Sequence, residues 1–131
     1  MKPGERDELV RYRLQCANEA LAEARLLMSG DHLRGSTNRL YYAMFYDVVA
    51  LLATRDVYPK THKGVRQQFS LLFLSERLIP EHLGLAYSEL FERRHSGDYD
   101  DFVSIDGEAV TRLHEQTVGM LNPIEGIISN G

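Results

Sequence analysis

The 131-residue chain has one cysteine, Cys16, no tryptophan, and four widely spaced prolines. A single cysteine allows no internal disulfide and no cysteine-rich metal site, and it fits a reducing cytoplasm. No apolar run approaches the ~18 residues that a membrane span needs. The first residues are too charged for a signal peptide. The sequence therefore disfavours secreted and membrane-inserted proteins, and we expect a cytoplasmic protein that contacts no membrane.

Charge of one sign does not dominate the sequence, whose formal net charge is −4. Residues 1–66 carry 11 Lys and Arg against 8 Asp and Glu, whereas residues 67–131 carry 4 against 11. A chain with this balance is not expected to bind nucleic acid over its whole surface. A local basic face in the first half and a simple uneven scatter of surface charge both remain open.

Helix-period patterns fill the segments between the prolines, and no alternating strand pattern of useful length occurs. The stretches at 5–28 and 33–54 each place apolar residues on one face. Thr61 is the expected N-cap of a third helix, and Pro80 fits the first turn of a fourth that ends near residues 94–97. A fifth helix is expected to start between residues 104 and 106, and Pro123 to end or kink it. We predict an all-α, up-and-down bundle of four to five helices in one domain, residues 1–131.

Motifs for metal binding, phosphate-cradling glycine loops and catalytic triads are absent from the sequence. The histidines lie far apart in sequence. Glu19 and Glu23 are one helical turn apart, but no Glu-x-x-His unit follows, which favours a solvated acidic face over a di-iron centre. We therefore expect neither a metal nor a cofactor.

Two polar segments, residues 36–43 and 93–102, carry the residue types of a binding site. An arginine can hold two phosphate oxygens at once, a nearby histidine can move protons near neutral pH, and a tyrosine offers a ring and a hydroxyl. Such a group could hold a phosphodiester. An alternative needs no ligand: Arg94 and Asp98 are four residues apart, and they or Arg39 could form an ion pair that ties helices together.

In order and spacing these segments resemble the HEPN family (higher eukaryotes and prokaryotes nucleotide-binding domain), over about residues 10–125. The resemblance is closest to small prokaryotic members. The matching motifs are Ser36-x-x-Arg39-x-Tyr41-Tyr42-Ala43-x-Phe45, then Thr61-His62-Lys63-Gly64, and finally Arg94-x-x-x-Asp98-Tyr99. Each motif is short, and it is their common order that carries the resemblance.

The resemblance implies a helical bundle that forms a homodimer and is encoded beside a minimal nucleotidyltransferase, its partner in a toxin–antitoxin pair. Many relatives are metal-independent ribonucleases, in which an Arg-x(4–6)-His motif from each of two copies forms the site that cleaves RNA. It implies a candidate catalytic pair, Arg94 and His95. The implied ligand-binding residues are Arg39, Tyr42, His62, Lys63, Asp98 and Tyr99.

The sequence departs from the ribonuclease motif, because Tyr99 and Asp100 stand where its histidine is expected. A tyrosine, with an ordinary pKa of ~10, is a poor base at neutral pH. One hypothesis is therefore a non-catalytic module that binds a partner protein, a nucleotide or RNA. A second is a ribonuclease toxin with a variant site that uses Arg94 with His95 or His62. A third is a purely structural oligomerisation bundle.

Aromatic residues are crowded on the second predicted helix, where Tyr41, Tyr42, Phe45 and Tyr46 follow one another closely. We do not expect all four rings to fit inside one small bundle, so the crowding predicts a dimer. Every functional hypothesis that involves a site also requires the segment around the paired tyrosines to meet the segment around Arg94 in space.

Overall fold

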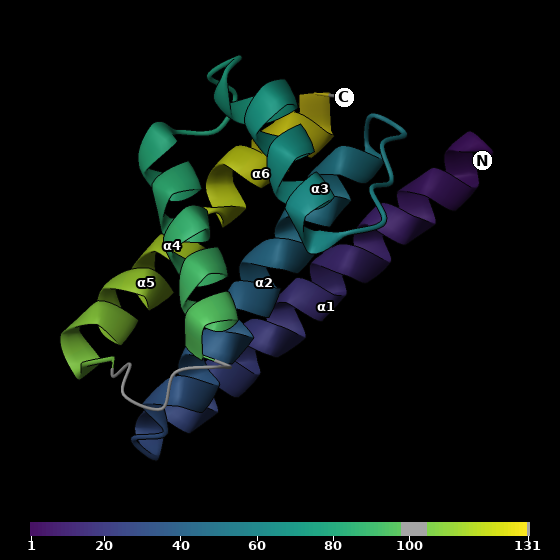
Figure 1. Cartoon of the computed structure of the whole chain (residues 1–131). Coiled ribbons are helices and arrows are strands. Elements are labelled where there is room, and N and C mark those ends of the chain that lie inside the picture. The colour runs from purple at the N-terminus through teal and green to yellow at the C-terminus, as the bar shows by residue number, and fades with distance from the viewer. Residues whose placement is uncertain (98–104, 131) are drawn as a thin grey trace.

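The computed structural model describes residues 1–97 and 105–130, with the backbone alone for residues 95–97 and 130. These residues form helices and no strand (Figure 1), which confirms the predicted all-α fold. No helix within them has the length and apolar character needed to cross a membrane. The elements are α1 (Pro3–Ser29), α2 (Leu33–Ala53), α3 (His62–Phe69), the π-helical turn η1 (Ser70–Leu74), α4 (Glu81–Gly97), α5 (Gly107–Gly119) and α6 (Leu121–Asn130).

The two long helices α1 and α2 form an antiparallel pair joined by a tight turn (Figure 1). The Gly30 N–H donates to the Leu26 carbonyl at 3.3 Å and closes the end of α1. Gly30 itself keeps a φ of −94°, and Asp31 is the residue that takes the left-handed conformation, at 62°. Aspartate tolerates that region better than most residues, so the turn needs no glycine there.

Helix α2 is the centre of the bundle, because α1, α3, α4, α5 and α6 all pack against it. Its predicted apolar face is fully buried, with Leu40, Met44, Val48 and Leu51 each 0% exposed. Burial on this scale is the main stabilising contribution to a small helical protein. It also fixes the rotation of α2, and so sets which of its side chains reach the surface.

Helix α3 begins where the sequence predicts it. The Thr61 hydroxyl accepts a hydrogen bond from the Gly64 N–H at 2.9 Å, as an N-cap should. This cap holds His62 at the first position of α3. The helix then widens into η1, where the Ser75 N–H donates to the Ser70 carbonyl at 2.9 Å, five residues back.

The later helices follow the predicted order with small shifts. Pro80 lies just before α4, and its carbonyl accepts the first bond of that helix, from the Leu83 N–H at 3.1 Å. The Asp106 carboxylate caps α5 by accepting from the Ala109 N–H at 2.8 Å. The predicted role of Pro123 is wrong, because α5 already ends at Gly119 and Pro123 lies in the first turn of α6. A proline costs nothing there, since the first N–H groups of a helix have no partner within it.

Candidate functional site

The segment around the paired tyrosines and the segment around Arg94 meet in space, as the functional hypotheses require. The Arg94 guanidinium donates from Nη2 to the Tyr42 hydroxyl at 2.7 Å. Its central carbon also lies 5.5 Å from the ring centre of Tyr41 and 5.1 Å from that of Tyr42. Helix α4 thus presents one arginine to two successive rings of α2, at distances where a cation is attracted to an aromatic face.

A second arginine approaches Tyr42 from within α2. The central carbon of the Arg39 guanidinium lies 4.9 Å from the ring centre of Tyr42. Its Nη1 is 3.4 Å from the Glu23 carboxylate of α1, and its Nη2 donates to the Asn38 side chain at 3.2 Å. Two cations therefore share one tyrosine ring.

His62 completes the group from the start of α3. Its Nδ1 lies 2.7 Å from the Tyr41 hydroxyl, and its ring stacks on Phe45 with the ring centres 4.5 Å apart. Burial raises the pKa of Tyr41 to about 12, so this phenol keeps its proton at neutral pH. The Tyr41 hydroxyl and His62 Nδ1 thus share one hydrogen bond, in which the imidazole tautomer decides which of them donates. We call Arg39, Tyr41, Tyr42, His62 and Arg94 the tyrosine–arginine cluster.

The cluster is cationic at its rim. Within the described residues Arg94 forms no salt bridge, and its Nε is buried with no hydrogen-bond acceptor in reach. Glu23 is the carboxylate that balances Arg39, and its side chain is 57% exposed, so water weakens that pair. Two guanidinium groups held on one ring offer several N–H donors that can bind the oxygens of an anion.

Metal chemistry finds no support around the cluster. Across residues 1–97 and 105–130, no three His, Cys, Asp or Glu side chains gather closely enough to hold an ion. The groups that are present can bind oxygens, stack on flat rings and, through His62, move a proton. That set matches a phosphate-bearing ligand with an aromatic base.

Not every predicted site residue joins the cluster. Lys63 is exposed in the first turn of α3, next to His62, and makes no hydrogen bond, ion pair or cation–π contact with the cluster. His95 continues α4, but its side chain lies outside the described residues, as do Asp98 and Tyr99. The Arg94–His95 pair and the Arg94–Asp98 ion pair therefore stay predictions.

Sequence reasoning assigned no role to two contacts of the cluster. Phe45, one turn after Tyr41 on α2, supports the His62 ring. Glu23, predicted to lie on a solvated acidic face, instead reaches Arg39 across the α1–α2 interface. The spacing of Tyr41 and Phe45 indicates that the two rings are neighbours on α2, but not that Phe45 contacts His62. The second contact depends on how α1 and α2 pack, which no local pattern gives.

Comparison with known proteins agrees with the resemblance drawn from the motifs. The family model of the HEPN domain matches residues 10–127, a span that includes the whole tyrosine–arginine cluster. The chain belongs to the HEPN family. This HEPN domain is 33% identical over 126 residues to a UPF0332 protein of Thermotoga maritima, a match that covers 96% of each chain.

Two further relatives come from the archaeon Methanocaldococcus jannaschii. One, named "Putative toxin MJ0605", is 32% identical over 108 residues, which cover 82% of this HEPN domain and 81% of the relative. The other, named "Putative toxin MJ0142", is 30% identical over 100 residues, which cover 76% of this HEPN domain and 68% of the relative. The similarity thus extends over most of each protein and is not limited to one motif.

Proposed function

We propose that this chain is a toxin-like HEPN module, a single domain over residues 1–131, that binds single-stranded RNA at the tyrosine–arginine cluster. The observation that carries the proposal is the convergence of Arg39 and Arg94 on Tyr42. Arginine forks bind phosphate oxygens, and the half-buried rings of Tyr42 and Phe45 beside them can stack on bases. Single-stranded RNA offers both groups in a regular repeat.

The test measures binding of a labelled RNA of about 12 nucleotides by fluorescence anisotropy in EDTA, over a range of salt concentrations. We expect Arg94→Ala to weaken binding at least roughly tenfold and to lower the salt slope by about 0.7, the value for one lost phosphate contact on a single strand. The matched control is Arg112→Ala, since Arg112 is exposed on α5 and pairs with Glu89 at 2.9 Å, outside the cluster. Equal affinity of the Arg94→Ala variant and the wild type would refute the proposal.

A metal-independent ribonuclease is the second candidate function. The observation in its favour is that His62 contacts the same two tyrosine rings as Arg94. In such a reaction the arginine would stabilise charge on the phosphate in the transition state, and the histidine would move a proton to or from the ribose 2′-hydroxyl. The same EDTA mixtures, run on a denaturing gel, decide between the two candidates. Cleavage that is lost in both His62→Ala and Arg94→Ala would assign the enzyme, and intact RNA would leave a binding module.

The proposal includes a homodimer built on the aromatic edge of α2. Tyr41 is fully buried, whereas Tyr42, Phe45 and Tyr46 remain half-buried, so the four rings do not all fit inside one bundle, and Tyr46 is the ring that a second copy would cover. On neighbouring α1, Tyr12 is 62% exposed. We expect sedimentation at micromolar concentration to give a dimer, which Tyr46→Glu converts to a monomer because a charge would be buried in the interface. A wild type that sediments only as a monomer contradicts this part of the proposal.

The toxin-like role rests on the names of the two archaeal relatives. The family resemblance adds a nucleotidyltransferase partner in a toxin–antitoxin-type pair. Purification from the native cell tests that partner, because a stable pair should leave the column together. We expect a nucleotidyltransferase to elute with the tagged protein and to be absent when an untagged strain is treated in the same way.

A further inference from the structure

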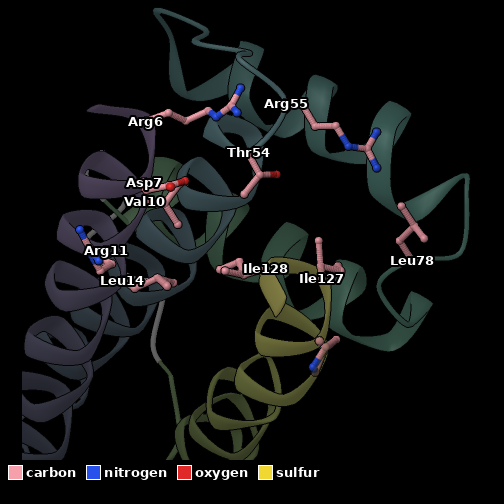
Figure 2. A pocket seen from close by; sticks show the side chains of 12 residues that line it. Arg6, Asp7, Val10, Arg11, Leu14, Thr54, Arg55, Leu78, Ile127 and Ile128 are labelled. Carbon is pink, nitrogen blue, oxygen red and sulfur yellow. The ribbon is translucent and has the colours of Figure 1, made fainter. Parts of the chain in front are cut away.

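A concave surface lies at the other end of the bundle, away from the start of α2. It is a groove of about 790 Å³ between the first half of α1, the end of α2, the loop before α4 and helix α6 (Figure 2). A volume of this size falls in the range of functional ligand pockets. None of the tyrosine–arginine cluster lines it, so whatever the groove binds is independent of the proposed RNA site.

The floor of the groove is apolar. Val10 and Leu14 of α1 face Ile127 and Ile128 of α6 across it (Figure 2), and Leu78, 41% exposed, stands at the far wall. Apolar side chains that line an open groove leave surface in contact with water, and covering that surface is favourable because it removes apolar area from water. The groove therefore favours a partner that presents apolar side chains.

The rim is basic in a protein that is acidic overall. Three arginines line the groove against one acidic residue, Asp7, whereas the whole chain has a net charge of −4. Arg6 is held by Asp56, with Nη1 and Oδ2 2.7 Å apart. Within the described residues, Arg11 and Arg55 have no carboxylate partner. Figure 2 shows them on opposite sides of the floor.

We infer that the groove is a docking site for a partner-protein segment that forms an amphipathic helix with an apolar face edged by aspartate or glutamate. The apolar face would cover the floor, and the carboxylates would pair with Arg11 and Arg55 on the two sides. Helices commonly bind in this way, with anchors at i, i+3, i+4 and i+7. Charge complementarity selects an acidic segment over a basic one.

A substitution at Gly126 tests whether filling the groove blocks binding. It lines the cavity from α6, and a Cβ added there would meet nothing within 4 Å. Gly126→Ala should therefore leave the groove open and slightly strengthen α6, because alanine favours helix more than glycine does. Gly126→Phe should place a ring in the cavity, with Gly126→Ala as its matched control.

The experiment uses the full chain and a fluorescein-labelled peptide of about 12 residues, about three helical turns, with leucine on one face and glutamate on the others. We expect the peptide to bind the wild-type protein. Its affinity should be at least roughly tenfold weaker for Gly126→Phe, which corresponds to about 1.4 kcal/mol. For Gly126→Ala the affinity should stay within about twofold of the wild-type value. Arg11→Glu should also weaken binding, whereas Arg34→Glu should not. Arg34 is equally exposed but lies at the opposite end of the 21-residue helix α2, roughly 30 Å from Arg55.

Four results would overturn the inference. The glutamate peptide could fail to bind, a lysine-substituted twin could bind equally well, or Gly126→Phe and Arg11→Glu could leave the affinity unchanged. Binding of oleate in place of the peptide would assign the groove to a lipid and reject a protein segment. Circular dichroism and thermal unfolding of each variant confirm that the fold is kept, and Arg11→Glu, at an exposed position, supplies the answer if Gly126→Phe does not fold.

Discussion

Replacement of Asp47 by asparagine is expected to stabilise the protein in neutral and alkaline solution. Asp47 lies on α2 among core residues, is 3% exposed, and its Oδ1 has no hydrogen-bond partner in the described residues. Burial raises the pKa of this carboxyl from 3.8 to about 8. An isolated buried carboxylate is costly, so the folded protein holds the acid in its neutral form.

The sign of the pH dependence follows from that raised pKa. Below pH 4 both the folded and the unfolded chain keep the Asp47 proton, and the full stability is present. Between pH 4 and 8 only the folded chain keeps it, so each added pH unit lowers the free energy of unfolding by about 1.4 kcal/mol. Above pH 8 both states have released the proton, and the loss is complete.

Urea unfolding of wild type and Asp47→Asn at a series of pH values from 5 to 9 measures this difference directly. We expect the free energy of unfolding of the variant, relative to that of the wild type, to rise steadily up to about pH 8, by several kcal/mol in all. Above pH 8 the difference should stay constant. Asp56→Asn is the control, because Asp56 is exposed and forms an ion pair with Arg6. A difference between wild type and Asp47→Asn that does not change with pH would show that Asp47 ionises normally in the folded protein.

Truncation of Tyr42 to alanine is expected to weaken both folding and RNA binding, whereas Tyr42→Phe affects mainly one contact. The Tyr42 ring is the point at which Arg39 and Arg94 meet, and its hydroxyl accepts the Arg94 bond. The alanine variant loses the ring and the surface that positions both cations. We expect it to cost roughly 2–4 kcal/mol of stability, since large aromatic truncations in packed sites commonly do.

The phenylalanine variant keeps the ring and removes the hydroxyl. Its free energy of unfolding should fall by at most about 1.5–3 kcal/mol, the range for a hydrogen bond to a charged group. RNA affinity should fall a few-fold for Tyr42→Phe and by more than tenfold, about 1.4 kcal/mol, for Tyr42→Ala. Tyr46→Phe, one turn further along α2, is the control, because the Tyr46 hydroxyl forms no hydrogen bond with the described part of the chain. Chemical unfolding and anisotropy are read on the same samples. RNA affinity that is equal in all three variants would remove Tyr42 from the site.

The sequence was most informative where local chemistry decides structure. The Thr61 cap could be predicted, and the start of α5 could be narrowed to residues 104–106, because a hydroxyl or carboxylate before a helical pattern satisfies free N–H groups of the first turn. The buried face of α2 could be predicted from its period, since apolar residues three and four apart share one side of a helix. These two signals gave the fold class and the helix that carries the site.

The sequence was least informative where one extra residue in a turn changes the helix type, and where the packing of two helices determines which side chains meet. The π-helical turn η1 adds one residue to a turn, and the apolar spacing of Val65, Phe69 and Phe73, four and four, differs little from the helical period. The division between α5 and α6 falls at Met120, three residues before Pro123, where the sequence predicted the end or kink of the helix. The reach of Glu23 to Arg39 depends on the packing of two helices, and periodicity alone does not fix it.

The meeting of Arg94 with Tyr42 could be anticipated only through the family resemblance, because 52 residues separate them in the sequence. Composition argued in the opposite direction, since a net charge of −4 does not favour RNA. Within the described residues, the guanidinium groups of Arg39 and Arg94 both lie against the Tyr42 ring, and Glu23 is the one carboxylate paired with either of them. A locally basic site needs no basic protein.

The central claim is that the tyrosine–arginine cluster is where RNA binds, and an NMR titration of ¹⁵N-labelled protein with the single-stranded RNA tests it most directly. We predict that the backbone amide signals that move first and furthest belong to residues 38–46, 62–66 and 90–94, and that Arg94→Ala abolishes these shifts. Shifts confined to the groove residues of α1 and α6 would contradict the claim. An absence of shifts at RNA concentrations in large excess over the protein would contradict it as well.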